Sequence, residues 1–237
     1  MEHLSFPNES AAYRTARNAL LDAEIALRRQ LEAVAAQRRA LPPGGLVPED
    51  YVFERIGANE RPEPVRLSEL FGDFPSILLY SFMYGPERDQ PCPGCTHMLD
   101  AIDGSARHAN PRFPIYVVTR SPVARLAAWM GQRGWSHLIP LSDLGSYTTD
   151  YHGNTAGLPQ PMRDARGYKA GEDWDEPMFN VFRRDGDTVR HFWGSELTYA
   201  PEDPGQHHRA GDLVDPLWGL LDMSPEGRGD YFPKLNY

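Results

Sequence analysis

Cysteine is scarce in this 237-residue chain. The two that occur, Cys92 and Cys95, are too few for the disulfide framework that holds small secreted domains together. They are separated by two residues, and in a reducing compartment the spacing Cys-x-x-Cys indicates a redox or metal site more often than a structural disulfide.

Long apolar runs are missing as well. The longest near the middle, residues 77–84, is far too short to span a bilayer. The first ten residues have neither the basic start nor the apolar stretch of a secretory signal. We therefore expect a soluble, cytoplasmic protein that does not act at a membrane.

Positive charge is in deficit, because 24 basic residues face 33 acidic ones and leave a formal net charge of -9. A surface of this sign argues against nucleic acid as a partner. The chain also lacks a phosphate-binding loop, a dinucleotide-binding glycine pattern and a Ser-His-Asp order. We therefore expect no cofactor.

One long helix is predicted for residues 10–41, which contain no glycine or proline and precede Pro42-Pro43-Gly44-Gly45. Ser10 can cap its start. Apolar residues recur in it at seven-residue steps, flanked by alanines, as a seam of Tyr13, Leu20, Leu27, Val34 and Leu41. The seam either packs on its own domain or joins two copies into a homodimer. We divide the chain into a helical extension, residues 1–45, and a main domain, residues 46–237.

Short strand-like segments alternate with helical ones in the main domain, which predicts an α/β fold with a mixed central sheet flanked by helices. The predicted strands are residues 51–56, 64–67, 76–83, 113–118, 137–141, 178–184 and 188–193. Helices are predicted for residues 92–109, 123–133 and 212–221, with a helical turn around residues 70–71. Residues 142–177 are rich in Gly, Pro and charge, and we expect a structureless, functional stretch there.

The Cys-x-x-Cys motif follows a buried strand and opens a helix. The amides and the dipole at a helix start favour a thiolate, so the pKa of Cys92 should fall. Pro93 suits the first helical turn because its missing N–H is not needed there. We assign Cys92 as the attacking thiolate and Cys95, one turn later, as the thiol that resolves a mixed disulfide.

Metal binding is the main chemical alternative, with His97 as a third ligand beside the two cysteines. A structural zinc site needs four ligands, and no second cysteine pair exists. His97 should also point away from the face that carries Cys95. We therefore predict no metal, and interpret His97 as a solvated helix residue.

A second feature supports the redox interpretation. Glu176-Pro177 precedes the predicted hairpin, whose turn is Asp185-Gly186. This resembles the thioredoxin fold, in which a cis-proline precedes the hairpin strand and faces the dithiol. We expect a cis bond at Pro177, and we expect Pro177, Glu176, Pro93 and Gly94 to form the substrate-docking surface. The Glu176 carboxylate would either raise the thiol pKa or act as a base for Cys95.

Matching segments along nearly the whole chain resemble one known family: residues 38–42, 50–53, 67–72, 92–95, 120–122, 134–135 and 220–228. It is the bacterial thioredoxin-like family catalogued as domain of unknown function eight hundred and ninety-nine, often described as predicted dithiol-disulfide oxidoreductases or isomerases. The resemblance implies a thioredoxin-like fold with an N-terminal helical extension.

Three functions remain open. The first is a thiol-disulfide oxidoreductase acting on a protein or a low-molecular-weight disulfide or thiol. The second is a peroxiredoxin-like peroxidase, in which peroxide oxidises Cys92 to a sulfenic acid that condenses with Cys95. The third is a non-catalytic binding module that uses the long helix and residues 142–177 as docking surfaces.

Overall fold

The computed structural model describes residues 4–237. The chain forms two compact units, Met1–Pro43 and Gly44–Tyr237. No helix in the described part is both long and apolar enough to cross a membrane.

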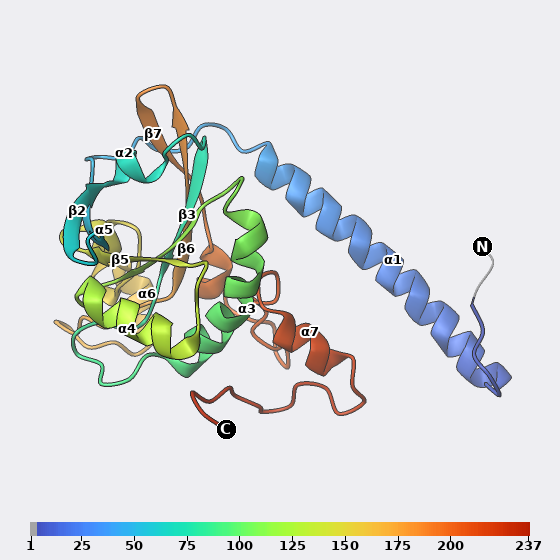
Figure 1. Cartoon of the computed structure of the whole chain (residues 1–237). Coiled ribbons are helices and arrows are strands. Elements are labelled where there is room, and N and C mark those ends of the chain that lie inside the picture. Colours follow the sequence, from blue (N-terminus) through green and yellow to red (C-terminus); the bar gives the residue numbers. More distant parts are fainter. Residues whose placement is uncertain (1–3) are drawn as a thin grey trace. The chain divides into compact units, whose positions relative to one another are not determined.

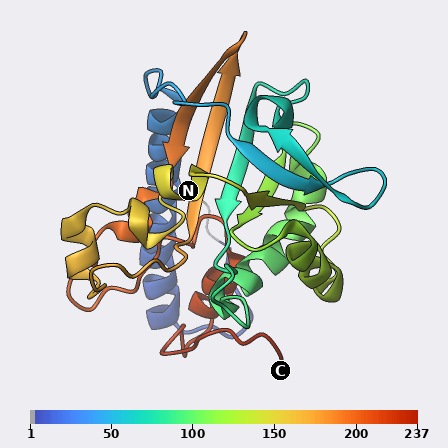
Figure 2. The same cartoon turned by 90° about the vertical axis from the view of Figure 1, so that its left-hand side faces the viewer.

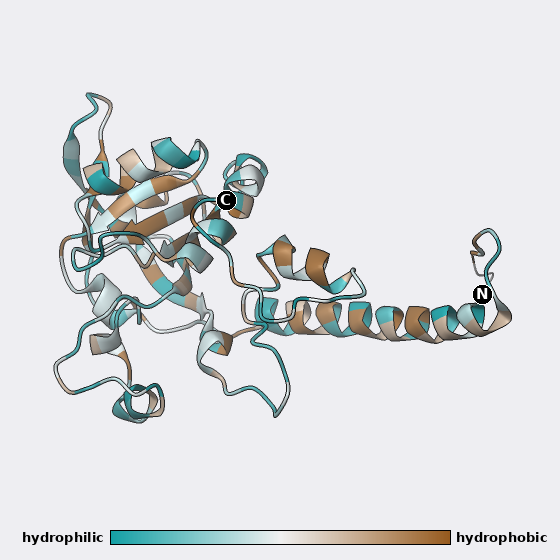
Figure 3. Ribbon diagram, turned by 90° about the horizontal axis from the view of Figure 1, so that it is seen from below, coloured by the Kyte–Doolittle hydropathy of each residue, from teal (hydrophilic) through white to brown (hydrophobic). Residues whose placement is uncertain are grey.

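The first unit contains the helix α1, Ala11–Arg39. Its start is set as predicted, because the Ser10 hydroxyl accepts a hydrogen bond of 3.1 Å from the amide of Tyr13. No residue of α1 is buried. The side chains of the apolar seam are therefore not buried. Figure 3 shows brown, hydrophobic bands recurring along the helix.

The second unit is built on a seven-stranded sheet with the strand order β2-β1-β5-β4-β3-β6-β7 (Figures 1 and 2). β3 pairs with β4, and β4 with β5, in parallel, whereas the other neighbours are antiparallel. The sheet is therefore mixed, as predicted. Its strands are β1 (Val52–Ile56), β2 (Pro62–Arg66), β3 (Ser76–Ser81), β4 (Ile115–Thr119), β5 (Ile139–Asp143), β6 (Met178–Asp185) and β7 (Thr188–Gly194).

Apolar clusters cover both faces of this sheet. Alternation along β3 sends Ile77 and Leu79 into one cluster and Tyr80 into the other. The Tyr80 cluster also contains Cys95, so the helix that carries the dithiol packs on this face. The helices are α2 (Leu67–Leu70), α3 (Pro93–Ala109), α4 (Val123–Arg133), α5 (Tyr147–Asp150), α6 (Gln160–Ala165) and α7 (Pro216–Asp222), with short 3₁₀ turns η1 (Thr155–Gly157) and η2 (Glu196–Tyr199).

The expectation of a structureless segment at residues 142–177 is wrong, because α5, η1 and α6 lie within it. Polar contacts hold this segment together with isolated buried side chains such as Tyr147 and Leu158, which follow no apolar periodicity. The Arg163 side chain is buried and donates hydrogen bonds to the carbonyl oxygens of Thr155 and Glu172. Contacts of this kind leave no periodic signal in a sequence.

The predicted cis bond before Pro177 is also wrong, since the described residues contain no cis peptide bond. The chain enters β6 in an extended course instead of a tight bend. Asp175 forms a bridge with Asn154, and the Glu176 amide donates to the Gly153 carbonyl oxygen at 3.0 Å. An extended entrance suits the trans form, which X–Pro bonds intrinsically prefer.

Candidate active site

Backbone hydrogen bonds fix Cys92 at the start of α3, where it is the N-cap residue. Its amide donates to the Met83 carbonyl oxygen at 3.0 Å, which ties it to the end of the β3 segment. Its own carbonyl oxygen accepts from the Thr96 amide and hydroxyl, both at 2.9 Å. Pro93 occupies the first helical turn, as the sequence suggests.

This position makes Cys92 acidic. A hydrogen bond with the Cys95 thiol lowers the pKa of Cys92 most, and the amides of Cys95 and Gly94 and the charge of Arg88 add to the effect. Burial acts in the opposite direction, yet the pKa falls to about 6. Cys92 is therefore largely a thiolate at neutral pH.

Cys95 has the opposite character. The Cys92 sulfur and complete burial raise the pKa of the Cys95 thiol well above its ordinary value. The Tyr80 hydroxyl interacts with the Cys95 sulfur and partly offsets this rise. That hydroxyl is buried and has no nitrogen or oxygen partner among the described residues. The pair is thus poised as a thiolate beside a protonated thiol.

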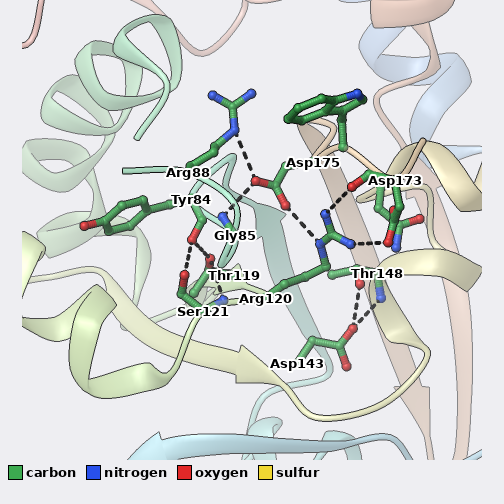
Figure 4. A network of polar contacts seen from close by, with 12 residues as sticks. Tyr84, Gly85, Arg88, Thr119, Arg120, Ser121, Asp143, Thr148, Asp173 and Asp175 are labelled. Atoms are coloured by element: carbon green, nitrogen blue, oxygen red, sulfur yellow. Dashed lines mark hydrogen bonds and ion pairs between the residues drawn. The ribbon is translucent and has the colours of Figure 1, made fainter. Parts of the chain in front are cut away.

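A buried carboxylate, Asp175, holds the loop before Cys92 in place (Figure 4). It accepts a hydrogen bond of 2.7 Å from the Gly85 amide and pairs with Arg120 at 2.9 Å. It also pairs with Arg88 at 3.2 Å, which holds this positive charge near Cys92. A Cβ on Gly85 would lie 2.4 Å from an Asp175 carboxylate oxygen, so a larger residue there would push this carboxylate from its contacts.

Arg125 of α4 supports the same loop from the other side. Its guanidinium stacks on Tyr84, 4.1 Å from the ring centroid, and donates to the Gly85 carbonyl oxygen at 3.2 Å. It also donates to the carbonyl oxygen of Arg88. The loop that delivers the dithiol is therefore fixed by charged groups from three other parts of the chain: α4, Arg120 after β4, and the segment before β6.

The dithiol faces a cavity of about 460 Å³. Of the predicted site residues, Cys92, Cys95, Gly94 and Pro177 line this cavity. The lining is mostly apolar and aromatic, with Tyr80 and Phe179 from the sheet, Met83 and Met98 from the loop after β3 and from α3, and Trp218, Tyr231 and Phe232 from the C-terminal segment. Polar side chains that include His207, His208 and Arg228 complete it.

Glu176, in contrast, does not line this cavity. Its buried carboxylate accepts a hydrogen bond of 2.5 Å from the Tyr168 hydroxyl and lies 3.5 Å from Arg166. Tyr168 and Arg166 follow α6 in the chain, so this carboxylate binds side chains within the 142–177 segment. The structure does not bring it beside the cysteines as the sequence suggested.

The interpretation of His97 as a solvated residue is wrong. Only 15% of its side chain is exposed, and its Nε2 lies 2.6 Å from an oxygen of the buried Asp215. Its ring meets Trp218 edge to face at 6.1 Å. Asp215 caps α7, which brings the C-terminal segment against α3 (Figure 1). Among the described residues, no three His, Cys, Asp or Glu side chains gather as a metal site.

Sequence reasoning missed the C-terminal wall of the cavity. The signal that could have placed α7 was local, since Asp215-Pro216 is a capping residue followed by a first-turn proline. Nothing local indicates that this helix lies against the dithiol. That contact depends on the pairing of His97 with Asp215, which are distant in sequence.

A helix that begins with a dithiol and follows a parallel strand, beside the antiparallel pair β6–β7, defines a thioredoxin-like protein. The family model described as a bacterial protein of unknown function (DUF899) matches residues 4–236, and the chain belongs to this family. Comparison with curated proteins gives no match.

Three solved structures illustrate what the chain is similar to. A peroxiredoxin is 14% identical with a TM-score of 0.47, over 73% of this chain and 98% of its own. The Plasmodium falciparum antioxidant protein, a 1-Cys peroxiredoxin, is 15% identical with the same TM-score and coverage. A putative thioredoxin reductase from Burkholderia cenocepacia is 16% identical with a TM-score of 0.39, over 70% of this chain and 90% of its own.

Proposed function

We propose that this protein is a thiol-disulfide oxidoreductase. One observation carries the proposal: Cys92 caps a helix with its pKa lowered to about 6, beside a buried thiol, Cys95, whose pKa is raised. An acidic, partly accessible thiol attacks disulfides, whereas a protonated neighbour waits to resolve the product.

The reaction takes place in two exchanges. The Cys92 thiolate attacks one sulfur of the substrate disulfide, forms a mixed disulfide and releases the first substrate thiolate. Cys95 then loses its proton to the departing sulfur and attacks the Cys92 sulfur. This closes the Cys92–Cys95 disulfide and releases the second substrate thiol, so the protein loses the two electrons that the substrate gains.

Mass spectrometry and trapping test the proposal. After mild oxidation of the reduced protein, we expect one intramolecular disulfide that a reductant reverses. In Cys95→Ser the mixed disulfide on Cys92 should accumulate, whereas Cys92→Ser should form none. If Cys92 and Cys95 stay as free thiols in the presence of disulfide substrates, the proposed oxidoreductase activity is wrong.

The same preparation distinguishes the two alternatives. Rapid peroxide consumption with a sulfenic acid on Cys92, together with slow disulfide exchange, would indicate a peroxidase instead. A protein whose partner binding survives alkylation of both thiols would be a binding module.

A further inference from the structure

Part of the chain covers the dithiol. The C-terminal segment contributes Trp218, Tyr231 and Phe232 to the wall of the cavity that contains Cys92 and Cys95. The Phe232 ring lies beside Gly94 at the start of α3: a Cβ placed on Gly94 would be 3.2 Å from its Cζ and 3.9 Å from the Cys92 Sγ. Gly94 therefore gives Phe232 room to lie over the start of α3.

Buried and ion-paired contacts fasten this segment to the domain. Asp215 is 3% exposed, lies 2.6 Å from His97 on α3 and accepts a hydrogen bond of 3.1 Å from the Leu217 amide. Arg228 lies 2.9 Å from Asp212 and stacks over Trp218, 5.4 Å from the ring centroid. The wall is thus an ordered part of the fold.

The size and lining of the cavity suit a small molecule. At about 460 Å³ it falls in the range of small-ligand pockets, roughly 300–1,000 Å³. Its aromatic and thioether side chains favour an apolar or aromatic body, and the buried Tyr80 hydroxyl offers a polar contact beside Cys95.

We propose, on the basis of the oxidoreductase function above, that the substrate is a low-molecular-weight disulfide with an apolar or aromatic body. The body lies between Phe179 and the C-terminal aromatic residues, and one of its sulfurs faces Cys92. The C-terminal segment acts as a selectivity wall that excludes protein disulfides.

Exchange rates with three disulfides test this proposal: dithiodipyridine, which is aromatic, bis(hydroxyethyl) disulfide, which is polar, and insulin. Each rate is divided by the rate of dithiothreitol with the same disulfide, which removes differences in intrinsic reactivity. We expect the corrected rate for dithiodipyridine to be at least about tenfold above that for either of the others, corresponding to about 1.4 kcal/mol.

Variants of the wall provide the second readout. Phe232→Ala removes a ring that is 60% exposed, so the fold should tolerate it, and Trp218→Ala removes a second aromatic ring of the wall. Both should lower the aromatic preference and raise the insulin rate. Leu220→Ala is the matched control, because Leu220 is on the same helix α7, is 61% exposed and does not line the cavity. It should behave like the wild type.

The possible results are distinguishable. If insulin reacts as fast as dithiodipyridine and Phe232→Ala changes neither rate, the proposed substrate class is wrong, whereas the proposed oxidoreductase activity is still supported. If none of the three disulfides oxidises Cys92 and Cys95, the proposed function is wrong, and the substrate class falls with it.

Discussion

Cys92 and Cys95 stand one helical turn apart, yet their pKa values move in opposite directions. Cys92 sits at the N-cap, where amides and the neighbouring thiol stabilise negative charge, whereas Cys95 is buried in the apolar cluster below. The difference in charge state therefore comes from position in the helix and in the core. It supports the assignment of Cys92 as the nucleophile in the proposed reaction.

Replacement of Cys95 should change the acidity of its partner. In Cys95→Ala the pKa of Cys92 should rise by at least about one unit toward the ordinary thiol value of about 8.5, because the largest lowering contact is lost. Cys95→Ser keeps a hydrogen-bond donor and is the matched control, with a smaller rise. Thiolate absorbance against pH measures both. If the titration midpoint of Cys92 is unchanged in Cys95→Ala, the backbone amides and Arg88 are enough to lower the pKa of Cys92 without the Cys95 thiol.

Asp175 should contribute far more to stability than its neighbour Asp173, although both pair with Arg120. The Asp175 side chain is 5% exposed, so Asp175→Ala leaves the Gly85 amide and two arginines without their buried partner. We expect a loss of about 3 kcal/mol in the free energy of unfolding.

Asp173→Ala is the matched control for that loss. The Asp173 side chain is 47% exposed, and the variant should lose less than about 1 kcal/mol. Urea denaturation of the reduced variants measures both values. Equal losses would contradict the role assigned to burial.

At the scale of elements, local signals set several helix ends. α4 spans Val123–Arg133 as predicted, and Gly134 ends it in the left-handed region at φ 76°. α7 begins at Pro216, four residues after its predicted start, because Asp215 caps it. Where capping residues decide a helix end, the sequence is a good guide, and at α7 the local signal for the start is Asp215-Pro216.

The apolar seam of α1 is exposed and could pair two copies of the helix. Since no residue of α1 is buried, self-association remains a prediction that these exposed side chains support. If two copies pair through the seam, Leu20→Glu combined with Leu27→Glu should halve the molar mass measured by light scattering.

Thr15→Glu combined with Asn18→Glu is the control for that experiment, because it adds the same charge to α1 outside the seam. It should keep the wild-type mass. A wild type that is already monomeric, or a seam variant of unchanged mass, would reject association through α1.

For the molecule as a whole, the acidity of Cys92 links folding to pH. Its pKa is about 6 when folded and about 8.5 in an unfolded chain, so between these values the unfolded state binds more protons. The reduced protein should therefore gain stability as the pH rises from about 6 to about 8, and lose this contribution as the pH falls through 6.

Comparison with Cys92→Ser isolates this effect from the titration of other groups. The difference in unfolding free energy between the reduced wild type and this variant should grow across the same pH range. Above about pH 8.5 the difference should stop growing, because Cys92 is then deprotonated in both the folded and the unfolded state. A difference that stays constant with pH would contradict the lowered pKa of Cys92.

The sequence by itself determined the features that depend on neighbours along the chain. Ser10 caps α1, Cys92-Pro93 opens α3, and alternating apolar segments give the mixed sheet of a thioredoxin-like fold. Each of these follows from backbone geometry, capping or hydrophobic periodicity, which act over a few residues.

Only the tertiary structure decided which distant groups meet at the dithiol. It placed Asp175 against Gly85 and Arg88, paired His97 with Asp215, and turned the Glu176 carboxylate toward Tyr168. It also made the Pro177 bond trans, through an extended entrance into β6. Such contacts join segments far apart in the chain, and their partners are chosen by burial and charge compensation in the folded molecule, which no local pattern records.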